Sequence, residues 1–395
     1  MIIGLEQYKS KWNIYTDSAI HPGLEAITSA LAELDNPHRS GRFIHLAGTN
    51  GKGSTAAFLS AILQAHGHSV GNFYSPCIED LHDQIQINGE PVSREELGAV
   101  MERLSEVKTP LTDFELLTAA ALLVFQQRAP DFAIIEAGMG GALDSTNVIN
   151  PEISIIPSIS FDHTHFLGNT IEEIARHKAG IIKKWKPVVV GELPQEAMNI
   201  VQQTADSLHA EVICLHQTID VILKLKGAHQ KKNASLAIEA AKELLRTDYS
   251  EEKALKSLES AVLSYRFEEV YPGVIFDGAH NKASIDALVE TIKENFPEQP
   301  IHIVMGIFKD KDYQNVLRQL ETVSDHFTFI DFKNERAMPA ESLFQESRSK
   351  RKTITNLYDI LPVSSEKEVT IVTGSLHLLA LLRSPNHSFF KHYQS

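Results

Sequence analysis

The sequence predicts an α/β fold in two parts: a larger P-loop-type domain with a mostly parallel sheet, and a smaller Rossmann-like α/β domain. Apolar strand-like runs alternate with amphipathic stretches along most of the 395 residues, which is typical of a parallel sheet with helices on both faces. The alternation stops at a predicted pair of helices and starts again near residue 273. A chain of this length suits two or three domains of about 150 residues each, so the restart predicts a second domain.

In the larger part, strands are predicted at residues 43–47, 70–74, 132–137, 153–159, 187–190 and 211–215. Helices are predicted at 54–66, 93–105, 113–128, 170–182 and 195–208, followed by a helical pair at about 230–247 and 250–262. The second alternation comprises strand 273–277, helix 281–295, strand 301–305, helix 312–321, strand 326–331, helix 340–348, strand 368–373 and helix 375–383. We place the boundary near residue 268, with 1–268 in the larger domain and 269–395 in the smaller one.

The composition favours a protein that binds small molecules. A net charge of −14 would repel nucleic acid and anionic membranes, so we expect neither as a partner. The chain contains two cysteines, Cys77 and Cys214, which fits a reducing compartment. The amino terminus becomes polar too early for a signal peptide, and no apolar run reaches the length of a membrane span. We therefore expect a cytoplasmic protein.

A glycine-rich loop at residues 48–55 predicts nucleotide binding. It reads Gly-Thr-Asn-Gly-Lys-Gly-Ser-Thr and joins the predicted strand at 43–47 to a helix. Glycines let backbone N–H groups approach phosphate oxygens, the start of a helix adds partial positive charge, and Lys52 can reach the outer phosphates. The alternative is a turn that only joins strand to helix. Three glycines and a lysine, with two hydroxyl residues at the end of the loop, favour a cradle for a nucleoside triphosphate.

The same loop lacks one feature of the common P-loop. Gly53 follows Lys52 at the position where a serine or threonine normally binds Mg²⁺, so this hydroxyl is displaced to Ser54 or lost. The metal would then need ligands from elsewhere. Glu136 and His163 follow two predicted strands and together indicate such a site, although each could be structural and histidine is an unusual Mg²⁺ ligand.

Other polar residues are weak signals in isolation. Lys178 lies on a predicted helix and could be an ordinary solvated lysine. Residues 227–234 offer polar side chains for a base or ribose, and Arg266 could reach a phosphate or be a linker charge. Residues 277–281 and 374–375 lead from predicted strands to helices, where ligands of open α/β sheets bind.

These segments, in this order, resemble the Mur ligase superfamily, and most closely its folylpolyglutamate synthase/dihydrofolate synthase family. The resemblance spans nearly the whole chain, and unrelated P-loop ATPases do not carry the later segments. It rests on residues 44–55, 136–147, 162–163 with 167–170, 178–181, 229–230 with 233–234, 277–281 and 373–376. It implies a Mur-ligase-type ATP-binding central domain at 1–268 and a C-terminal glutamate ligase domain at 269–395.

The resemblance also implies a role for each candidate residue. The nucleotide would be held by Thr49, Asn50, Gly51, Lys52, Gly53, Ser54, Asn233, Arg266, Asp277 and His280. Mg²⁺ would be bound by Ser75, Glu136 and His163, with Ser75 supplying the hydroxyl that the loop lacks. Lys178 would be carbamoylated, which turns a cation into a carboxylate-like metal ligand. The expected catalytic residues are Lys52, Lys178 and His163, and the expected substrate contacts are Phe114, Glu115, Leu143, Asp144 and Ser375.

The implied reaction is the ATP-dependent addition of L-glutamate to dihydropteroate, to reduced folates or to both, by a monomer. ATP phosphorylates a carboxylate to an acyl phosphate, which the amino group of glutamate then attacks. Two alternatives stay open. One is a Mur-type ligase for a different carboxylate and amino acid, and the other is a diverged ATP-binding paralogue without catalysis.

Several positions depart from the pattern of that family. Cys77 stands where histidine usually follows Ser-Pro, Gln84 and Ala142 replace arginines, His177 stands where glutamate is common, and Tyr265 replaces a glycine. The expected nucleotide and metal residues are all present. The departures therefore concern the choice of substrate more than the type of reaction.

Overall fold

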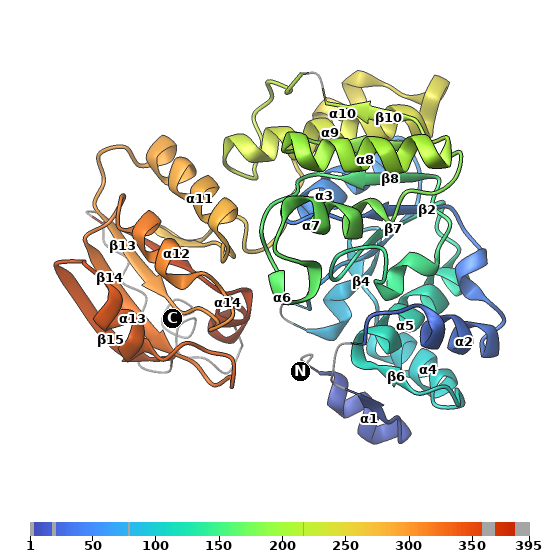
Figure 1. The fold of residues 1–395 in the computed structure, drawn as a ribbon, viewed down its shortest axis with the longest axis horizontal. Coiled ribbons are helices and arrows are strands. Elements are labelled where there is room, and N and C mark those ends of the chain that lie inside the picture. Colours follow the sequence, from blue (N-terminus) through green and yellow to red (C-terminus); the bar gives the residue numbers. More distant parts are fainter. Residues whose placement is uncertain (1–3, 18–20, 78–79, 216, 358–367, 384–395) are drawn as a thin grey trace. The chain divides into compact units, whose positions relative to one another are not determined.

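The structure is a computed structural model that describes residues 4–17, 21–77, 80–215, 217–357 and 368–383 (Figure 1). It divides into two compact units: unit 1 is Met1–Leu223 with Lys231–Ala261, and unit 2 is Lys224–Gln230 with Val262–Ser395. Parallel pairing dominates both main sheets, which confirms the predicted α/β fold class. The domain boundary at residue 268 stays a prediction. No helix of the described residues is long and apolar enough to cross a bilayer.

Unit 1 is built on an eight-stranded sheet with the order β10-β9-β8-β2-β7-β3-β4-β5. The strands from β10 to β3 pair in parallel, and β4 and β5 add an antiparallel edge. Their bounds are β2 (Phe43–Leu46), β3 (Val70–Phe73), β4 (Ile85–Ile87), β5 (Glu90–Pro91), β7 (Phe132–Glu136), β8 (Ile153–Ile156), β9 (Val188–Val190) and β10 (Val212–Cys214). A separate two-stranded sheet pairs β1 (Thr16–Asp17) with β6 (Leu111–Thr112).

Helices cover this sheet. They are α1 (Leu5–Trp12), α2 (Glu25–Glu33), α3 (Lys52–Ala65), α4 (Arg94–Leu104), α5 (Asp113–Arg128), α6 (Thr164–Leu167), α7 (Ile171–Ala179), α8 (Gln195–Leu208), α9 (Ala228–Leu245) and α10 (Glu251–Leu258). One face of the sheet buries apolar residues of α4 and α5 against β3 and β7, and of α7 and α8 against β8 and β9. α3 contacts β3 and β7 and packs against α10. Every residue of β2, β3, β7, β8 and β9 is buried, as expected for parallel strands covered on both faces.

The connections of unit 1 reverse direction between β2 and β8. α3 leads from β2 to β3, which lies on one side of β2, whereas α7 leads from β8 to β9 on the other side. In an open α/β sheet such a reversal opens a crevice outside the carboxyl ends of the strands, and ligands bind there. The glycine-rich loop after β2 therefore lies at the position where a ligand site is expected.

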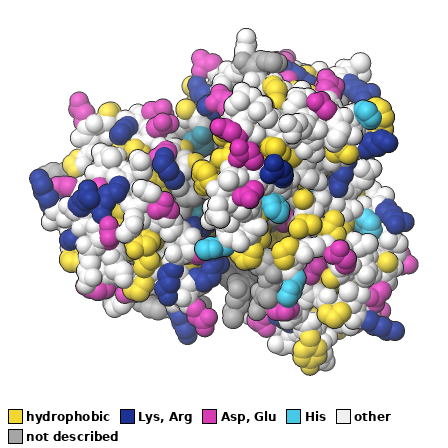
Figure 2. Space-filling view, viewed as in Figure 1, with side chains coloured by type: hydrophobic (Ala, Val, Ile, Leu, Met, Phe, Trp, Pro, Cys, Tyr) yellow, Lys and Arg dark blue, Asp and Glu magenta, His cyan; other side chains and the backbone are white. Residues whose placement is uncertain are grey.

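Unit 2 contains a six-stranded sheet with the order β11-β12-β16-β13-β14-β15, in which only the β11–β12 pair is antiparallel among the described strands. The strands are β11 (Glu268–Tyr271), β12 (Val274–Phe276), β13 (Ile301–Met305), β14 (His326–Asp331), β15 (Arg351–Asn356) and β16 (Val369–Thr373). The helices are α11 (Lys282–Asn295), α12 (Tyr313–Leu320), α13 (Ala340–Glu346) and α14 (Leu376–Arg383). Apolar residues of α11, α12 and α13 share one core with β12, β13, β14 and β16. On the face of the molecule shown in Figure 2, acidic and basic side chains are interspersed.

The predicted elements are present, and several end earlier than expected. The strand predicted at 153–159 ends at Ile156, and the helix predicted at 170–182 ends at Ala179. The sequence analysis did not identify α1, α2, α6, the short strands β1, β4, β5, β6 and β11, or the edge strand β15. Most of these elements are short, and β15 is largely exposed. None of the missed strands therefore carries the continuous apolar run on which the strand predictions rested.

Candidate active site

The phosphate loop between β2 and α3 is held in place by the loop that follows β8. The Thr49 N–H donates to the Ser158 carbonyl oxygen at 2.9 Å, and the Thr49 hydroxyl donates to the Ser160 carbonyl oxygen at 3.0 Å. The Asn50 N–H donates to the Ser158 hydroxyl at 3.0 Å, and this hydroxyl donates back to the Asn50 carbonyl oxygen at 2.9 Å. These bonds fix the loop at the point where the strand connections reverse.

Gly51 determines how α3 begins. Its φ of +88° lies in the left-handed region, which favours glycine, and α3 starts at the next residue. A Cβ at this position would lie 2.5 Å from Oδ1 of Asn233, a buried residue of α9. Glycine is therefore required both by the backbone conformation and by the close approach of Asn233. The structure brings the predicted nucleotide residue Asn233 against the phosphate loop.

Lys52 lies beside a buried carboxylate. Its Nζ is 3.7 Å from Oε1 of Glu136 and donates to the Gly48 carbonyl oxygen at 3.0 Å. Glu136 ends β7 and is 5% exposed, and the Ser75 N–H donates to its Oε2 at 3.5 Å. Hydroxyl and carboxylate oxygens are the ligands that Mg²⁺ prefers, so Ser75 and Glu136 fit a magnesium ion near Lys52.

His163 lies on the loop after β8, at the start of α6. Its backbone has a φ of +50°, and its N–H donates to Oδ1 of Asp162 at 2.9 Å. Its Nε2 lies 4.0 Å from the same oxygen, and its side chain is 40% exposed. The structure thus places His163 on the loop that also holds the phosphate loop.

Lys178 is buried, contrary to the alternative of a solvated surface lysine. It is 4% exposed and lies near the end of α7, whose buried residues are Ile174, Ala175, Lys178 and Ala179. The pKa of Lys178 is lowered to about 7, mainly by burial and also by the charge of Lys52, while Asp162 and Asp144 act in the opposite direction. The position of Lys178 on the apolar stripe of α7, four residues after Ile174, is the sequence signal that could have revealed this burial.

A cavity of about 310 Å³ lies in unit 1 beside these residues. Four of the five predicted substrate residues line it, together with the predicted metal ligand Ser75: they are Phe114, Glu115, Leu143 and Asp144. The ring of Phe114 stacks on Phe73 at 5.9 Å and lies so close to Gly138 that a Cβ there would approach it to 2.6 Å. The cavity and the predicted metal site therefore share a wall at Ser75.

Two carboxylates in the cavity wall, Glu115 and Asp144, already accept hydrogen bonds from nearby backbone N–H groups. Oε2 of Glu115 accepts bonds from the N–H and the hydroxyl of Thr112, which form a capping box at the start of α5. Oδ2 of Asp144 accepts from the Met139 N–H at 2.7 Å, and its Oδ1 accepts from the N–H and hydroxyl of Thr146. Burial raises the pKa of Asp144, although these bonds oppose the shift. Both residues shape the cavity wall.

The cavity also has walls that the sequence analysis did not predict. His21, Pro22 and Gly23 line it from the segment before α2, and Phe166 lines it from α6. His177, one of the departures from the family pattern, lines it from α7. Ala142, another departure, packs so closely on Gly180 that a Cβ at Gly180 would clash with it. The sequence signal for His177 is its departure from the family pattern, since glutamate is common at this position.

The remaining predicted residues lie in unit 2, at the carboxyl ends of the neighbouring strands β12 and β16. Asp277 accepts bonds from the Ala279 and Phe267 N–H groups; its pKa is raised by burial, an effect that Arg266 opposes. Nδ1 of His280 lies 2.8 Å from the Gly278 carbonyl oxygen. Ser375, 2% exposed, directly precedes α14, and its hydroxyl accepts a long bond of 3.5 Å from the Leu378 N–H. These residues therefore lie at the same end of the second sheet, where β12 and β16 have their carboxyl ends.

Comparison with known proteins agrees with this architecture. The chain matches the models of the Mur ligase middle domain over residues 46–214 and of the Mur ligase glutamate ligase domain over residues 265–376. It is 36% identical to the dihydrofolate synthase/folylpolyglutamate synthase of Bacillus subtilis, covering 92% of this chain and 95% of that protein. It is 32% identical to the folylpolyglutamate synthase of Lacticaseibacillus casei, covering 90% and 92% of the two chains.

Solved structures show the same fold. Mycobacterium tuberculosis folylpolyglutamate synthase, complexed with ADP and AMPPCP, aligns with a TM-score of 0.84 at 28% identity, over 92% of this chain and 95% of that one. Escherichia coli FolC in complex with DHPP and ADP aligns with a TM-score of 0.83 at 27% identity, over 95% of both chains.

The fold and the two domain matches define a Mur-type ligase, an ATP-dependent enzyme that joins an acid to an amino acid. Identity above 30% over nine-tenths of the chain narrows the class further. The chain belongs to the folylpolyglutamate synthase/dihydrofolate synthase family of the Mur ligase superfamily. The resemblance stated from the sequence is thereby confirmed.

Proposed function

We propose that this protein joins L-glutamate to the carboxylate of dihydropteroate, of reduced folates or of both, with cleavage of ATP to ADP and phosphate. One observation carries the proposal: Ser75 lines the 310 Å³ cavity and donates to Glu136, whose carboxylate lies 3.7 Å from the phosphate-loop Lys52. An acceptor in the cavity can therefore present its carboxylate to the γ-phosphate of a nucleotide bound at the loop. The membership of the family supports this reading.

The proposed chemistry follows from the charges in unit 1. A carboxylate oxygen of the acceptor attacks the γ-phosphorus and ADP leaves, which forms an acyl phosphate. Lys52 and the N–H groups at the start of α3 offset the negative charge of the transferred phosphoryl group. The amino group of glutamate then attacks the acyl carbon, phosphate leaves, and the amine loses a proton.

Mg²⁺ is part of the proposal, with Ser75, Glu136 and His163 as its ligands. Bound there, it would neutralise phosphate charge. Ser75 and Glu136 are supported by their contact and by their oxygen chemistry, whereas His163 is supported by its place on the loop that holds Thr49 and Asn50. The family relatives whose structures contain ADP support nucleotide binding at this loop.

Carbamoylation of Lys178 is also proposed. Only the neutral amine can attack CO₂, and burial lowers the pKa of Lys178 to about 7, so much of it is neutral near pH 7. The product would be an anion within reach of the positive charge of Lys52. The proposed set of nucleotide and substrate contacts also includes Asn233, Arg266, Asp277, His280 and Ser375. We further propose that the protein is a cytoplasmic monomer with domains at 1–268 and 269–395.

The direct test measures ADP release by the purified chain with ATP, Mg²⁺, L-glutamate and either dihydropteroate or tetrahydrofolate. We expect release to need glutamate and a pterin acceptor together. Lys52→Met should abolish it, because the charge beside Glu136 is lost, whereas the control Lys253→Met, an exposed lysine of α10, should retain full activity. Sedimentation of the same sample reports whether the protein is a monomer.

The outcomes separate the proposal from its alternatives. ADP release with another acid and amino acid, but with no pterin, would contradict the folate assignment and keep the ligase class. ATP binding without release in any combination of acids and amino acids would indicate a non-catalytic paralogue. Full activity of Lys52→Met would overturn the assignment of the phosphate loop.

A further inference from the structure

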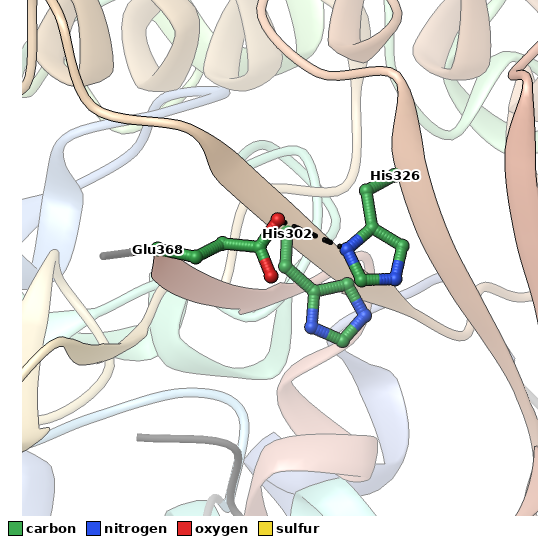
Figure 3. A group of neighbouring side chains, drawn as sticks. All are labelled: His302, His326 and Glu368. Atoms are coloured by element: carbon green, nitrogen blue, oxygen red, sulfur yellow. Dashed lines mark hydrogen bonds and ion pairs between the residues drawn. The ribbon is translucent and has the colours of Figure 1, made fainter. Parts of the chain in front are cut away.

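Three metal-binding side chains gather at the amino ends of three neighbouring strands of unit 2. His302 is the second residue of β13, His326 begins β14, and Glu368 directly precedes β16. One nitrogen of each ring and one oxygen of the carboxylate all lie within 4.8 Å of one another, and Figure 3 shows the carboxylate facing both rings. Among the described residues, no other group of three His, Cys, Asp or Glu meets this criterion.

His302 has the burial and the hydrogen-bond surroundings of a metal ligand. It is 5% exposed, and its Nε2 lies 2.8 Å from Oγ1 of Thr328, which is 3.0 Å from Oγ1 of Thr353. In the tautomer that carries its proton on Nε2, the ring donates to Thr328 and keeps a lone pair on Nδ1 for a metal. Nδ1 is buried and has no hydrogen-bond partner within the described part of the chain. A second-sphere hydrogen bond of this kind orients the histidines that bind metals in proteins.

His326 and Glu368 complete the cluster. The two imidazole rings stack at 3.9 Å with planes 13° apart, and Nδ1 of His326 lies 3.1 Å from Oε1 of Glu368. The same oxygen accepts a bond of 3.2 Å from Nη2 of Arg351, which also lies 3.3 Å from Oδ1 of Asp325. The Arg351 side chain is 55% exposed, so it can turn to Asp325 alone when a cation takes Glu368.

We propose that His302, His326 and Glu368 bind a divalent transition-metal ion, zinc in particular, with water as the fourth ligand. Two imidazole nitrogens and a carboxylate oxygen form a common zinc donor set. Ligand atoms of a tetrahedral zinc site lie about 3.3 Å apart, so atoms now within 4.8 Å close on an ion by side-chain rotation. The ion would link β13, β14 and β16 at their amino ends.

This site is independent of the proposed ligase activity. The predicted nucleotide and substrate residues of unit 2 lie at the carboxyl ends of β12 and β16, whereas the cluster lies at the amino ends of the strands of the same sheet. β16 runs from Val369 to Thr373, so its first and last residues are four steps apart, about 13 Å at 3.3 Å per step. Loss of the metal site should therefore reduce metal content and stability without abolishing nucleotide binding.

The test is a zinc titration of the metal-stripped full-length protein against a chromophoric chelator, with excess Mg²⁺ present to occupy oxygen-ligand sites. His302→Gln and Glu368→Gln should each lower zinc affinity by at least about tenfold, in line with the losses seen at metal sites whose surroundings are altered. The control Glu294→Gln, which removes an exposed carboxylate of α11, should match the unmodified protein. Arg351→Gln keeps all three ligands and should bind zinc more tightly, because its guanidinium no longer occupies Glu368.

Co²⁺ in place of zinc gives a second readout, because a tetrahedral nitrogen–oxygen site produces visible absorption bands. We expect these bands in the unmodified protein and in Arg351→Gln, and their loss in Glu368→Gln. Zinc should raise the melting temperature of the unmodified protein but not of Glu368→Gln. Equal zinc affinity in the unmodified protein, His302→Gln and Glu368→Gln would overturn the proposal. Weaker binding by Arg351→Gln than by the unmodified protein would also overturn it.

Discussion

Replacing Lys178 by methionine should stabilise unit 1 while removing ligase activity. The pKa of Lys178 falls from an ordinary value of 10.5 to about 7, because its charged form is buried near Lys52. This difference corresponds to about 5 kcal/mol of unfavourable free energy for the buried ammonium. Methionine has a similar length and no charge, so Lys178→Met removes this cost in protein that is not carbamoylated.

The pH dependence has a definite sign. Between pH 7 and 10.5 the unfolded chain keeps a proton on Lys178 that the folded chain has released, so the stability of the unmodified protein rises with pH in this window. The advantage of Lys178→Met should therefore be fully present below pH 7 and vanish as the pH approaches 10.5. Carbamoylation of Lys178 should likewise raise the stability of the unmodified protein, because it consumes the neutral amine of the folded chain. It should therefore also reduce the advantage of Lys178→Met.

The assay is denaturant unfolding in CO₂-free buffer at several pH values, followed by tryptophan fluorescence. Both tryptophans of the chain, Trp12 and Trp185, belong to unit 1, so the signal reports the unit that contains Lys178. Lys253→Met serves as the control for replacing an exposed lysine and should change stability little at any pH. A stability difference for Lys178→Met that is constant from pH 7 to 10.5 would refute the reasoning.

Adding bicarbonate to the same samples tests the modification itself. At pH 7 an amine with a pKa of about 7 is roughly half neutral, whereas one with a pKa of 10.5 is about a thousandfold less so. Bicarbonate should therefore stabilise the unmodified protein and leave Lys178→Met unchanged. Activity of Lys178→Ala should return in part with short carboxylic acids, and no return would count against the carbamate.

Three further predictions concern backbone and packing. Gly51→Ala should weaken ATP binding and destabilise unit 1 by at least about 1 kcal/mol in calorimetry, because φ is +88° and a Cβ would meet Oδ1 of Asn233 at 2.5 Å; unchanged binding would contradict this. Glu115→Gln should keep the KM for the acceptor within about threefold, because the carboxylate caps α5 through Thr112, whereas Thr112→Ala should cost about 1 kcal/mol; a large rise in KM would show that Glu115 contacts substrate. Tyr265→Gly should destabilise unit 2 by about 2 kcal/mol, because losing a fully buried ring costs about 3–5 kcal/mol while relief of its φ of +62° returns about 1–2 kcal/mol; a gain in calorimetric stability would contradict that balance.

The sequence determined the parts of the site that depend on local order. A buried run followed by glycines and a lysine specifies strand, loop and helix within about twenty residues, so the positions of Lys52 and of the carboxylate at the end of β7 could be predicted. Strongly apolar strands were likewise predicted, because their pattern is set by burial on both faces. The exposed edge strand β15 was not, since it has no such pattern.

Only the tertiary structure decided which residues that are distant in sequence lie close together and share one environment. Lys178 could not be distinguished from a solvated lysine until α7 was packed, since its pKa depends on desolvation and on the charges of Lys52, Asp162 and Asp144. The position of Ser75 in the wall of the 310 Å³ cavity, and the cluster of His302, His326 and Glu368, arise from strands that pair across long stretches of chain. Local sequence specifies backbone geometry through nearby contacts, whereas burial, electrostatics and ligand geometry depend on what the fold brings together from afar.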